Sequence, residues 1–162
     1  AAFRVHPEGT MVIRTSWVYA PEGQNFVKTM VRLGKERESI NVVADQIGSP
    51  TYAPDLALAV LQILQKVERG DVPKAALAGV WHYSNEGVAS WYDFAQAIFD
   101  IAIINCGVVP IETKDYPTPA KRPPFSVLNK GKIKGAFQVE VPHWRKSLEK
   151  CIFVIISQST IK

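Results

Sequence analysis

Three polar segments of this sequence carry side chains suited to binding an anionic ligand that is rich in hydroxyl groups. They are RTSWVYAPEGQN (14–25), DQIGSPTY (45–52) and AKRPPFS (120–126). Each one follows or flanks a stretch that is typical of a β-strand. In open α/β sheets ligands bind beyond the carboxyl ends of the strands. The three segments therefore predict one shared site.

Four side chains give this prediction its chemistry. Asn25 stands where a helix begins, and free N–H groups at a helix N-terminus bind phosphate. Arg122 carries a planar guanidinium for bidentate phosphate contacts, and prolines stiffen the chain around it. Trp17 offers an apolar face for a sugar ring and one N–H donor, and Gln46 offers a donor and an acceptor for sugar hydroxyls. Trp17, Asn25 and Arg122 each also have a structural alternative, which is a core tryptophan, a helix cap and a surface ion pair, respectively.

Other kinds of site find no support in the sequence. His6, His82 and His143 are far apart, and neither HExxH nor CxxC spacing occurs, so we expect no metal ligands among them. There is no GxSxG, no P-loop and no GxGxxG. None of the five tyrosines has a lysine four residues later. A Ser-His-Asp triad without a GxSxG elbow stays open, because the sequence alone does not show which of these residues meet.

The elements that must position the three segments follow from hydrophobic patterning. Strands are predicted at 12–19, 40–44 and 79–85, with a turn-rich loop at 45–54. Helices are predicted after Asn25, from Pro54 to Gly70, after a capping box of Ser90 and Asp93, and from about Pro142 to Ile152. The helix after Ser90 is expected to bury Trp91 with its other apolar residues. Strand and helix alternation predicts an α/β fold with parallel pairing.

Composition limits the class of protein. The 162 residues are 47% hydrophobic and 21% charged, and the formal net charge is +4. These values are typical of a globular chain without a basic-aromatic module, so we expect neither nucleic acid nor a membrane as a partner. Cys106 and Cys151 lie in apolar runs and are expected to be free, buried thiols in a cytoplasmic protein. Lys130, Lys132 and Lys134 are expected on a solvated face.

Taken in order, RTSWVY, DQxGxPT and RPxxSxL resemble the dTDP-4-dehydrorhamnose reductase family of extended short-chain dehydrogenases/reductases. The resemblance covers about 10–152 and leaves 153–162 as an unassigned tail. It implies the C-terminal part of a Rossmann-like parallel sheet with a small substrate-binding subdomain, in a single fragment, 1–162. The family's glycine-rich turn and its Tyr-x-x-x-Lys do not occur here. By this resemblance we expect no catalytic residue in this chain, and we expect the chain to be inactive by itself.

The resemblance also implies ligands and roles. The family reduces dTDP-4-dehydro-L-rhamnose to dTDP-L-rhamnose with NADPH or NADH. Thr15 and Ser16 are assigned to the cofactor side. The sugar nucleotide is assigned to Trp17, Asn25, Gln46, Gly48, Thr51 and Arg122. A homo-oligomer is expected, and a divalent ion such as Mg²⁺, which bridges subunits in some relatives, stays open. Two alternatives also stay open: a non-catalytic nucleotide-sugar-binding or regulatory module, and a sister nucleotide-sugar reductase or epimerase.

Overall fold

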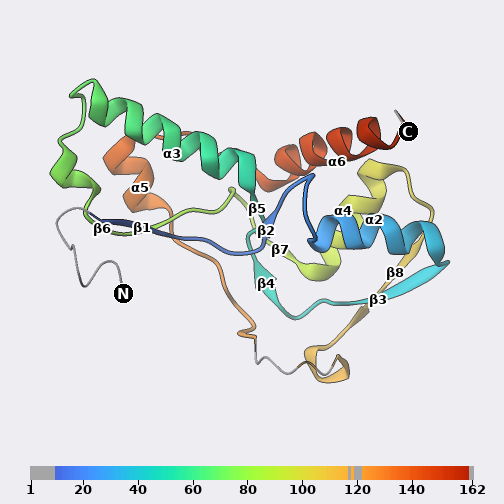
Figure 1. The fold of residues 1–162 in the computed structure, drawn as a ribbon. Coiled ribbons are helices and arrows are strands. Elements are labelled where there is room, and N and C mark those ends of the chain that lie inside the picture. Colours follow the sequence, from blue (N-terminus) through green and yellow to red (C-terminus); the bar gives the residue numbers. More distant parts are fainter. Residues whose placement is uncertain (1–9, 117, 119–121, 161–162) are drawn as a thin grey trace.

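The computed structural model describes residues 10–116, 118 and 122–160. Four pairs of strands organise these residues (Figure 1). Three of the pairs are parallel: β1 (Met11–Arg14) with β6 (Gly79–His82), β2 (Val18–Tyr19) with β5 (Thr51–Tyr52), and β3 (Ser39–Val43) with β8 (Gly107–Ile111). The fourth pair, β4 (Ile47–Gly48) with β7 (Ala89–Ser90), is antiparallel. The predicted α/β class with parallel pairing is confirmed.

Two hydrophobic clusters lie at opposite ends of the molecule. At one end α3 (Ala53–Glu68) and α5 (Gly131–Phe137) lie beside the β1–β6 pair, around buried Ile63, Trp81 and Phe137. At the other end α2 (Phe26–Glu36), α4 (Trp91–Ala102) and α6 (Trp144–Thr160) pack with the β3–β8 pair. The short pairs β2–β5 and β4–β7 connect these two ends (Figure 1).

Local sequence signals explain where the helices begin. The side chain of Asn25 accepts a hydrogen bond from the Lys28 N–H at the start of α2. Ser90 and Asp93 form both bonds of the predicted capping box at the start of α4. Pro54 lies in the first turn of α3, as predicted. Among the helices of the described residues, none has the length and apolar character needed to cross a bilayer.

The structure corrects several predicted elements. The strand predicted at 12–19 is two strands, because Trp17 takes φ +50°, a left-handed conformation that no strand accommodates. The strand predicted at 79–85 ends at His82, and the loop at 45–54 contains β4 and β5. The final helix continues to Thr160, so the tail that had no assignment is helical up to that residue.

The structure also corrects the prediction that Lys130, Lys132 and Lys134 all lie on a solvated face. Lys130 is buried, and its ammonium lies 3.5 Å from the Glu86 carboxylate and 3.4 Å from the carbonyl oxygen of Asn85. Lys132 and Lys134 are exposed, and Lys134 forms a 2.7 Å ion pair with Glu86. Lys130 is therefore part of the packing between α5 and the loop after β6. Cys106 and Cys151 are free and buried, as predicted.

Candidate functional site

The break between β1 and β2 brings the first polar segment against the second. The Ser16 hydroxyl donates to the carbonyl oxygen of Ser49 at 3.1 Å, and the Thr15 hydroxyl donates to the hydroxyl oxygen of Thr51 at 3.1 Å. The Thr51 N–H donates to the carbonyl oxygen of Trp17 at 3.0 Å. These bonds hold 15–17 beside 49–51, at the start of the parallel pair β2–β5.

The indole of Trp17 lies between Trp91 and Gly48. The Trp91 ring stacks on it with centroids 3.6 Å apart and an interplanar angle of 8°. A Cβ added to Gly48 would lie 2.5 Å from Cε2, 2.7 Å from Cζ2 and 2.8 Å from Nε1 of Trp17. Nearly equal distances to three adjoining ring atoms place Gly48 over the ring's face. No Trp91 atom is among the nearest atoms, so Gly48 covers the opposite face.

This sandwich changes what Trp17 offers to a ligand. The sequence predicted an apolar face for a sugar ring, but in the structure both faces are covered. What remains for a ligand is the edge of the indole, including its N–H. The general prediction that Trp17 contacts the ligand stays open, but not through stacking on its face.

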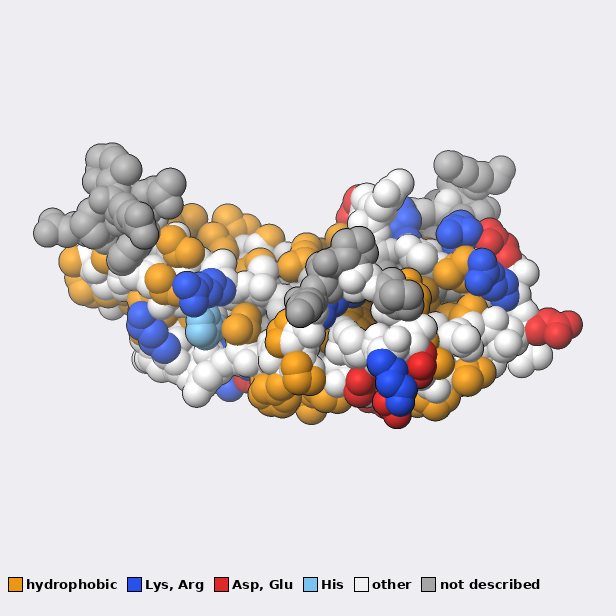
Figure 2. All heavy atoms as spheres, turned by 90° about the horizontal axis from the view of Figure 1, so that it is seen from below, with side chains coloured by type: hydrophobic (Ala, Val, Ile, Leu, Met, Phe, Trp, Pro, Cys, Tyr) orange, Lys and Arg blue, Asp and Glu red, His pale blue; other side chains and the backbone are white. Residues whose placement is uncertain are grey.

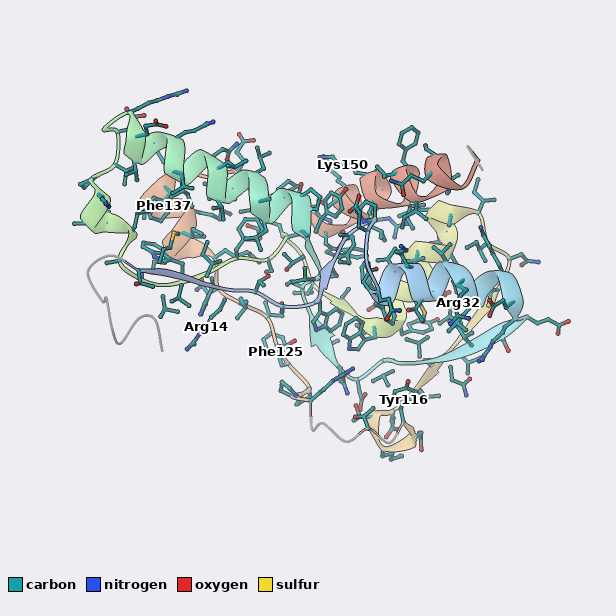
Figure 3. The ribbon with its side chains drawn as sticks, in the orientation of Figure 1. Arg14, Arg32, Tyr116, Phe125, Phe137 and Lys150 are labelled. Atoms are coloured by element: carbon teal, nitrogen blue, oxygen red, sulfur yellow. The ribbon has the colours of Figure 1, made fainter. Side chains whose placement is uncertain are left out.

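The third polar segment reaches the site by pairing with β4. The Ile47 N–H donates to the carbonyl oxygen of Pro124 at 2.7 Å, and the Ser126 N–H donates to that of Ile47 at 2.9 Å. Phe125, labelled in Figure 3, marks where this segment passes beside β4. The face seen in Figure 2 carries small groups of charged side chains, several of which contain basic and acidic side chains side by side, with hydrophobic side chains between the groups.

The three segments enclose a cavity of about 300 Å³. It is lined by Ser16, Trp17, Gln46, Trp91, Arg122, Pro123 and Ser126. Four predicted site residues therefore share one cavity: Ser16, Trp17, Gln46 and Arg122. Arg122 is exposed, and no ion pair to its guanidinium is found in the described part of the chain. This cavity therefore combines the guanidinium of Arg122, the indole edge of Trp17 and the amide of Gln46.

The other predicted residues lie around the cavity instead of lining it. The Asn25 side chain donates to the carbonyl oxygens of Ala20 and Glu22 at 2.7 and 3.2 Å. It also caps α2, which is the structural alternative that the sequence offered for this residue. Gly48 lies behind Trp17, and Thr51 is fully buried beneath Thr15. A direct role for these residues toward a sugar nucleotide stays a prediction.

Sequence reasoning missed Trp91, which was expected in the core but is half-buried and lines the cavity. It directly follows the capping box, so it stands on the first turn of α4. A large aromatic residue at a helix N-terminus beside a strand end was a usable signal. Thr113, in a 3-10 turn (Thr113–Asp115), was missed as well, because nothing in its sequence context points to Asp45 and Gln46.

A buried polar cluster, Asp55–Asn85–Ser147, supports the second polar segment (45–52) through the hydrogen bond between Asn85 and Tyr52. The Asn85 amide donates to the Asp55 carboxylate at 2.7 Å and accepts from the Tyr52 N–H at 2.8 Å. Ser147, on α6, donates to the same carboxylate. The cluster joins α3, the loop after β6 and α6. Burial, followed by the charge of Asp55, raises the pKa of the nearby Tyr83 hydroxyl.

Comparison with known proteins fits this geometry. The model of the RmlD substrate binding domain matches residues 2–156. The chain belongs to the RmlD substrate binding domain family. Over 146 residues it is 45% identical to a dTDP-4-dehydrorhamnose reductase of Aggregatibacter actinomycetemcomitans, covering 86% of this chain and 49% of that protein.

Two solved structures resemble this RmlD-family chain. The dTDP-4-dehydrorhamnose reductase of Clostridium acetobutylicum superimposes with a TM-score of 0.81 at 37% identity, covering 90% of this chain and 49% of that one. The reductase of Bacillus anthracis, solved in complex with NADP, gives a TM-score of 0.80 at 40% identity, covering 89% and 48%. The chain spans about half the length of the relatives it matches. The predicted family and Rossmann-like fold class are confirmed.

The volume of this cavity, about 300 Å³, lies at the lower end of the range for small-molecule sites. The hydroxyls of Thr15 and Ser16 already donate within the loops. In the residues that the structure describes, no group of three or more His, Cys, Asp or Glu side chains could hold a metal ion.

Proposed function

We propose that this chain is the substrate-binding part of a dTDP-4-dehydrorhamnose reductase and holds the sugar of dTDP-4-dehydro-L-rhamnose. The observation that carries the proposal is the shared cavity of Trp17, Gln46 and Arg122 in a chain of the RmlD family. Three segments that are remote in sequence converge there, although each has a plain structural alternative by itself.

The chemistry of the lining residues fits a sugar diphosphate. The guanidinium of Arg122 matches a phosphate, and prolines next to it restrict the local backbone. The amide of Gln46 and the hydroxyls of Ser16 and Ser126 supply polar atoms for sugar hydroxyls. The stacked Trp17 and Trp91 form a rigid apolar wall, which lowers the entropic cost of ordering side chains on binding.

NADPH or NADH supplies the hydride in the proposed reaction. Ser16, which lines the cavity, and its neighbour Thr15 would border the nicotinamide. The motif that would donate the proton does not occur in this sequence. We therefore expect this chain alone not to oxidise NADPH in the presence of dTDP-4-dehydro-L-rhamnose.

Calorimetric titration tests the proposal. The chain is titrated with dTDP-L-rhamnose, UDP-glucose and GDP-mannose, and separately with dTDP. We expect the thymidine sugar to bind more tightly than the other two nucleotide sugars. Arg122→Lys keeps the charge but loses the planar fork, and we expect weaker binding of every diphosphate. Equal affinity for all three nucleotide sugars would refute the assigned substrate, and absence of binding would refute the site.

A further inference from the structure

The amide of Gln46 is held in one orientation by residues outside the cavity. Gln46 is 7% exposed and lines the cavity, and its Nε2 donates to the Thr113 hydroxyl oxygen at 3.0 Å. Thr113 lies 67 residues further along the chain, in the turn that follows β8. This contact therefore depends on the parallel pairing of β3 with β8, which places 45–46 beside 113.

Asp45 decides the direction of that contact. Its carboxylate accepts the Thr113 N–H at 2.9 and 3.1 Å and the Thr113 hydroxyl at 2.6 Å. A carboxylate only accepts, and a hydroxyl has a single proton. The Thr113 proton is therefore used on Asp45, and only lone pairs are left for Gln46. The amide must present its nitrogen to Thr113, so its oxygen, Oε1, is turned away.

Two further observations support this arrangement. These hydrogen bonds, first the one from the Thr113 hydroxyl and then the one from its N–H, lower the pKa of Asp45, which keeps it an acceptor at neutral pH. No hydrogen bond to Oε1 of Gln46 is found among the described residues, and Oε1 is not among their buried, unpaired polar atoms. It is thus open to solvent on a residue that lines the cavity.

We propose that Asp45 and Thr113 are positioning residues that present Oε1 of Gln46 to the cavity as an acceptor for a hydroxyl of the bound sugar. The identity of that sugar rests on the proposed function. The orientation of the Gln46 amide does not rest on the proposed function, because it follows from the single hydroxyl proton of Thr113. The site then selects a ligand with a donor at this point, and an ether or a deoxy carbon there leaves the oxygen unpaired.

The test is a double-mutant cycle read by calorimetry with two probes, dTDP-L-rhamnose and dTDP. Thr113→Val keeps the side-chain shape and removes both the donor and the acceptor. Gln46→Met keeps the length and removes the amide. We expect either change to weaken dTDP-L-rhamnose about 5- to 15-fold, the effect of one lost hydrogen bond, and to leave dTDP unchanged. The double variant should bind no more weakly than Gln46→Met, because Thr113 acts through Gln46.

Two control variants and one further test variant complete the design. Thr113→Ser restores the hydroxyl and should bind like the wild type, whereas Thr10→Val, at the start of β1, removes a hydroxyl away from the cavity. Asp45→Ala removes the acceptor of the Thr113 proton, allows the amide of Gln46 to turn over, and should weaken dTDP-L-rhamnose as Thr113→Val does. This variant also keeps the test decisive if Thr113→Val does not fold.

Each outcome separates the two proposals. Unchanged affinity of Thr113→Val and Asp45→Ala for dTDP-L-rhamnose, or an equal loss for dTDP, overturns the positioning role. Additive losses in the double variant overturn it too, since they indicate a separate structural effect. A wild-type chain that binds neither probe overturns the proposed function itself, and with it the sugar assignment.

Discussion

Replacing Asn85 with alanine removes the centre of the buried Asp55–Asn85–Ser147 cluster. The Asn85 side chain accepts from the Tyr52 N–H at 2.8 Å and donates to Asp55 at 2.7 Å. The same amide nitrogen lies 3.1 Å from the carbonyl oxygen of Pro142 and 3.0 Å from the Ser147 hydroxyl oxygen, so its two protons are shared among three acceptors. The variant leaves the first three of these groups short of partners inside the protein.

The magnitude follows from those groups. A buried polar group without a partner costs about 1–3 kcal/mol. The Tyr52 N–H loses its bond to Asn85. The Pro142 carbonyl keeps only the Glu86 N–H at 2.9 Å, and Asp55 loses one charge-assisted bond but keeps Ser147. Because water enters part of the space, we expect a loss of about 3–5 kcal/mol in the free energy of unfolding. That is a large share of the ~5–15 kcal/mol of an ordinary domain.

Urea unfolding followed by tryptophan fluorescence measures this loss, and thermal unfolding should show a Tm lower by roughly 6–20 °C. Asn105→Ala is the matched control, because Asn105 is exposed. It should change stability by less than about 0.5 kcal/mol. A loss below about 1 kcal/mol in Asn85→Ala would refute the view that this cluster holds β5 in place.

Asn85→Asp separates hydrogen bonding from packing. It keeps the volume but faces Asp55 with a second carboxylate, and two like charges in a buried site raise the pKa of the pair in the folded state. The variant is therefore destabilised most above that raised pKa, and it regains stability as the pH falls through it. A variant whose stability relative to the wild type does not depend on pH would contradict this reasoning.

Three further predictions concern other parts of the chain. Gly48→Ala should cost about 1–3 kcal/mol in urea unfolding and weaken dTDP-sugar binding, because its Cβ would lie 2.5 Å from the Trp17 ring; Gly135→Ala, which meets nothing within 4 Å, is the control. Burial opposes ionisation of Glu86, but its lysine partners outweigh this and lower its pKa from 4.5. Its stabilising effect is thus complete above pH 4.5 and disappears as the pH falls through the lowered pKa; Glu86→Gln should flatten this part of the stability profile. Burial raises the pKa of Cys151 to about 12, so this thiol should react with a disulfide reagent at neutral pH only as fast as the chain unfolds; faster labelling would show that the site opens without unfolding.

The sequence predicted the features that depend on neighbouring residues. The cap at Asn25, the capping box at Ser90 and the apolar face of α3 act within one or two helical turns, and all three are present. The family resemblance is confirmed as well, and with it the Rossmann-like fold class. The convergence of Trp17, Gln46 and Arg122 was predicted from strand order alone, because parallel strands bring their carboxyl ends to the same edge.

Elements stabilised by distant partners were missed. Gly107–Ile111 contains a glycine and a proline, has a weak strand pattern, and forms β8 because β3 pairs with it along its full length. The seven-residue α5 is too short and too rich in glycine to be stable alone, and it depends on packing against β6. Lys130 looks like a surface lysine until Glu86 is brought to it from another loop.

The sequence by itself determined which residues could bind a sugar diphosphate and that their segments would meet. Only the tertiary structure decided how these side chains are arranged. Gly48 and Trp91 cover both faces of Trp17, and Thr113 fixes the orientation of the Gln46 amide. The physical reason is that local propensities depend on residues a few positions apart. Ring packing and the single proton of a hydroxyl depend on partners that only folding brings within contact distance.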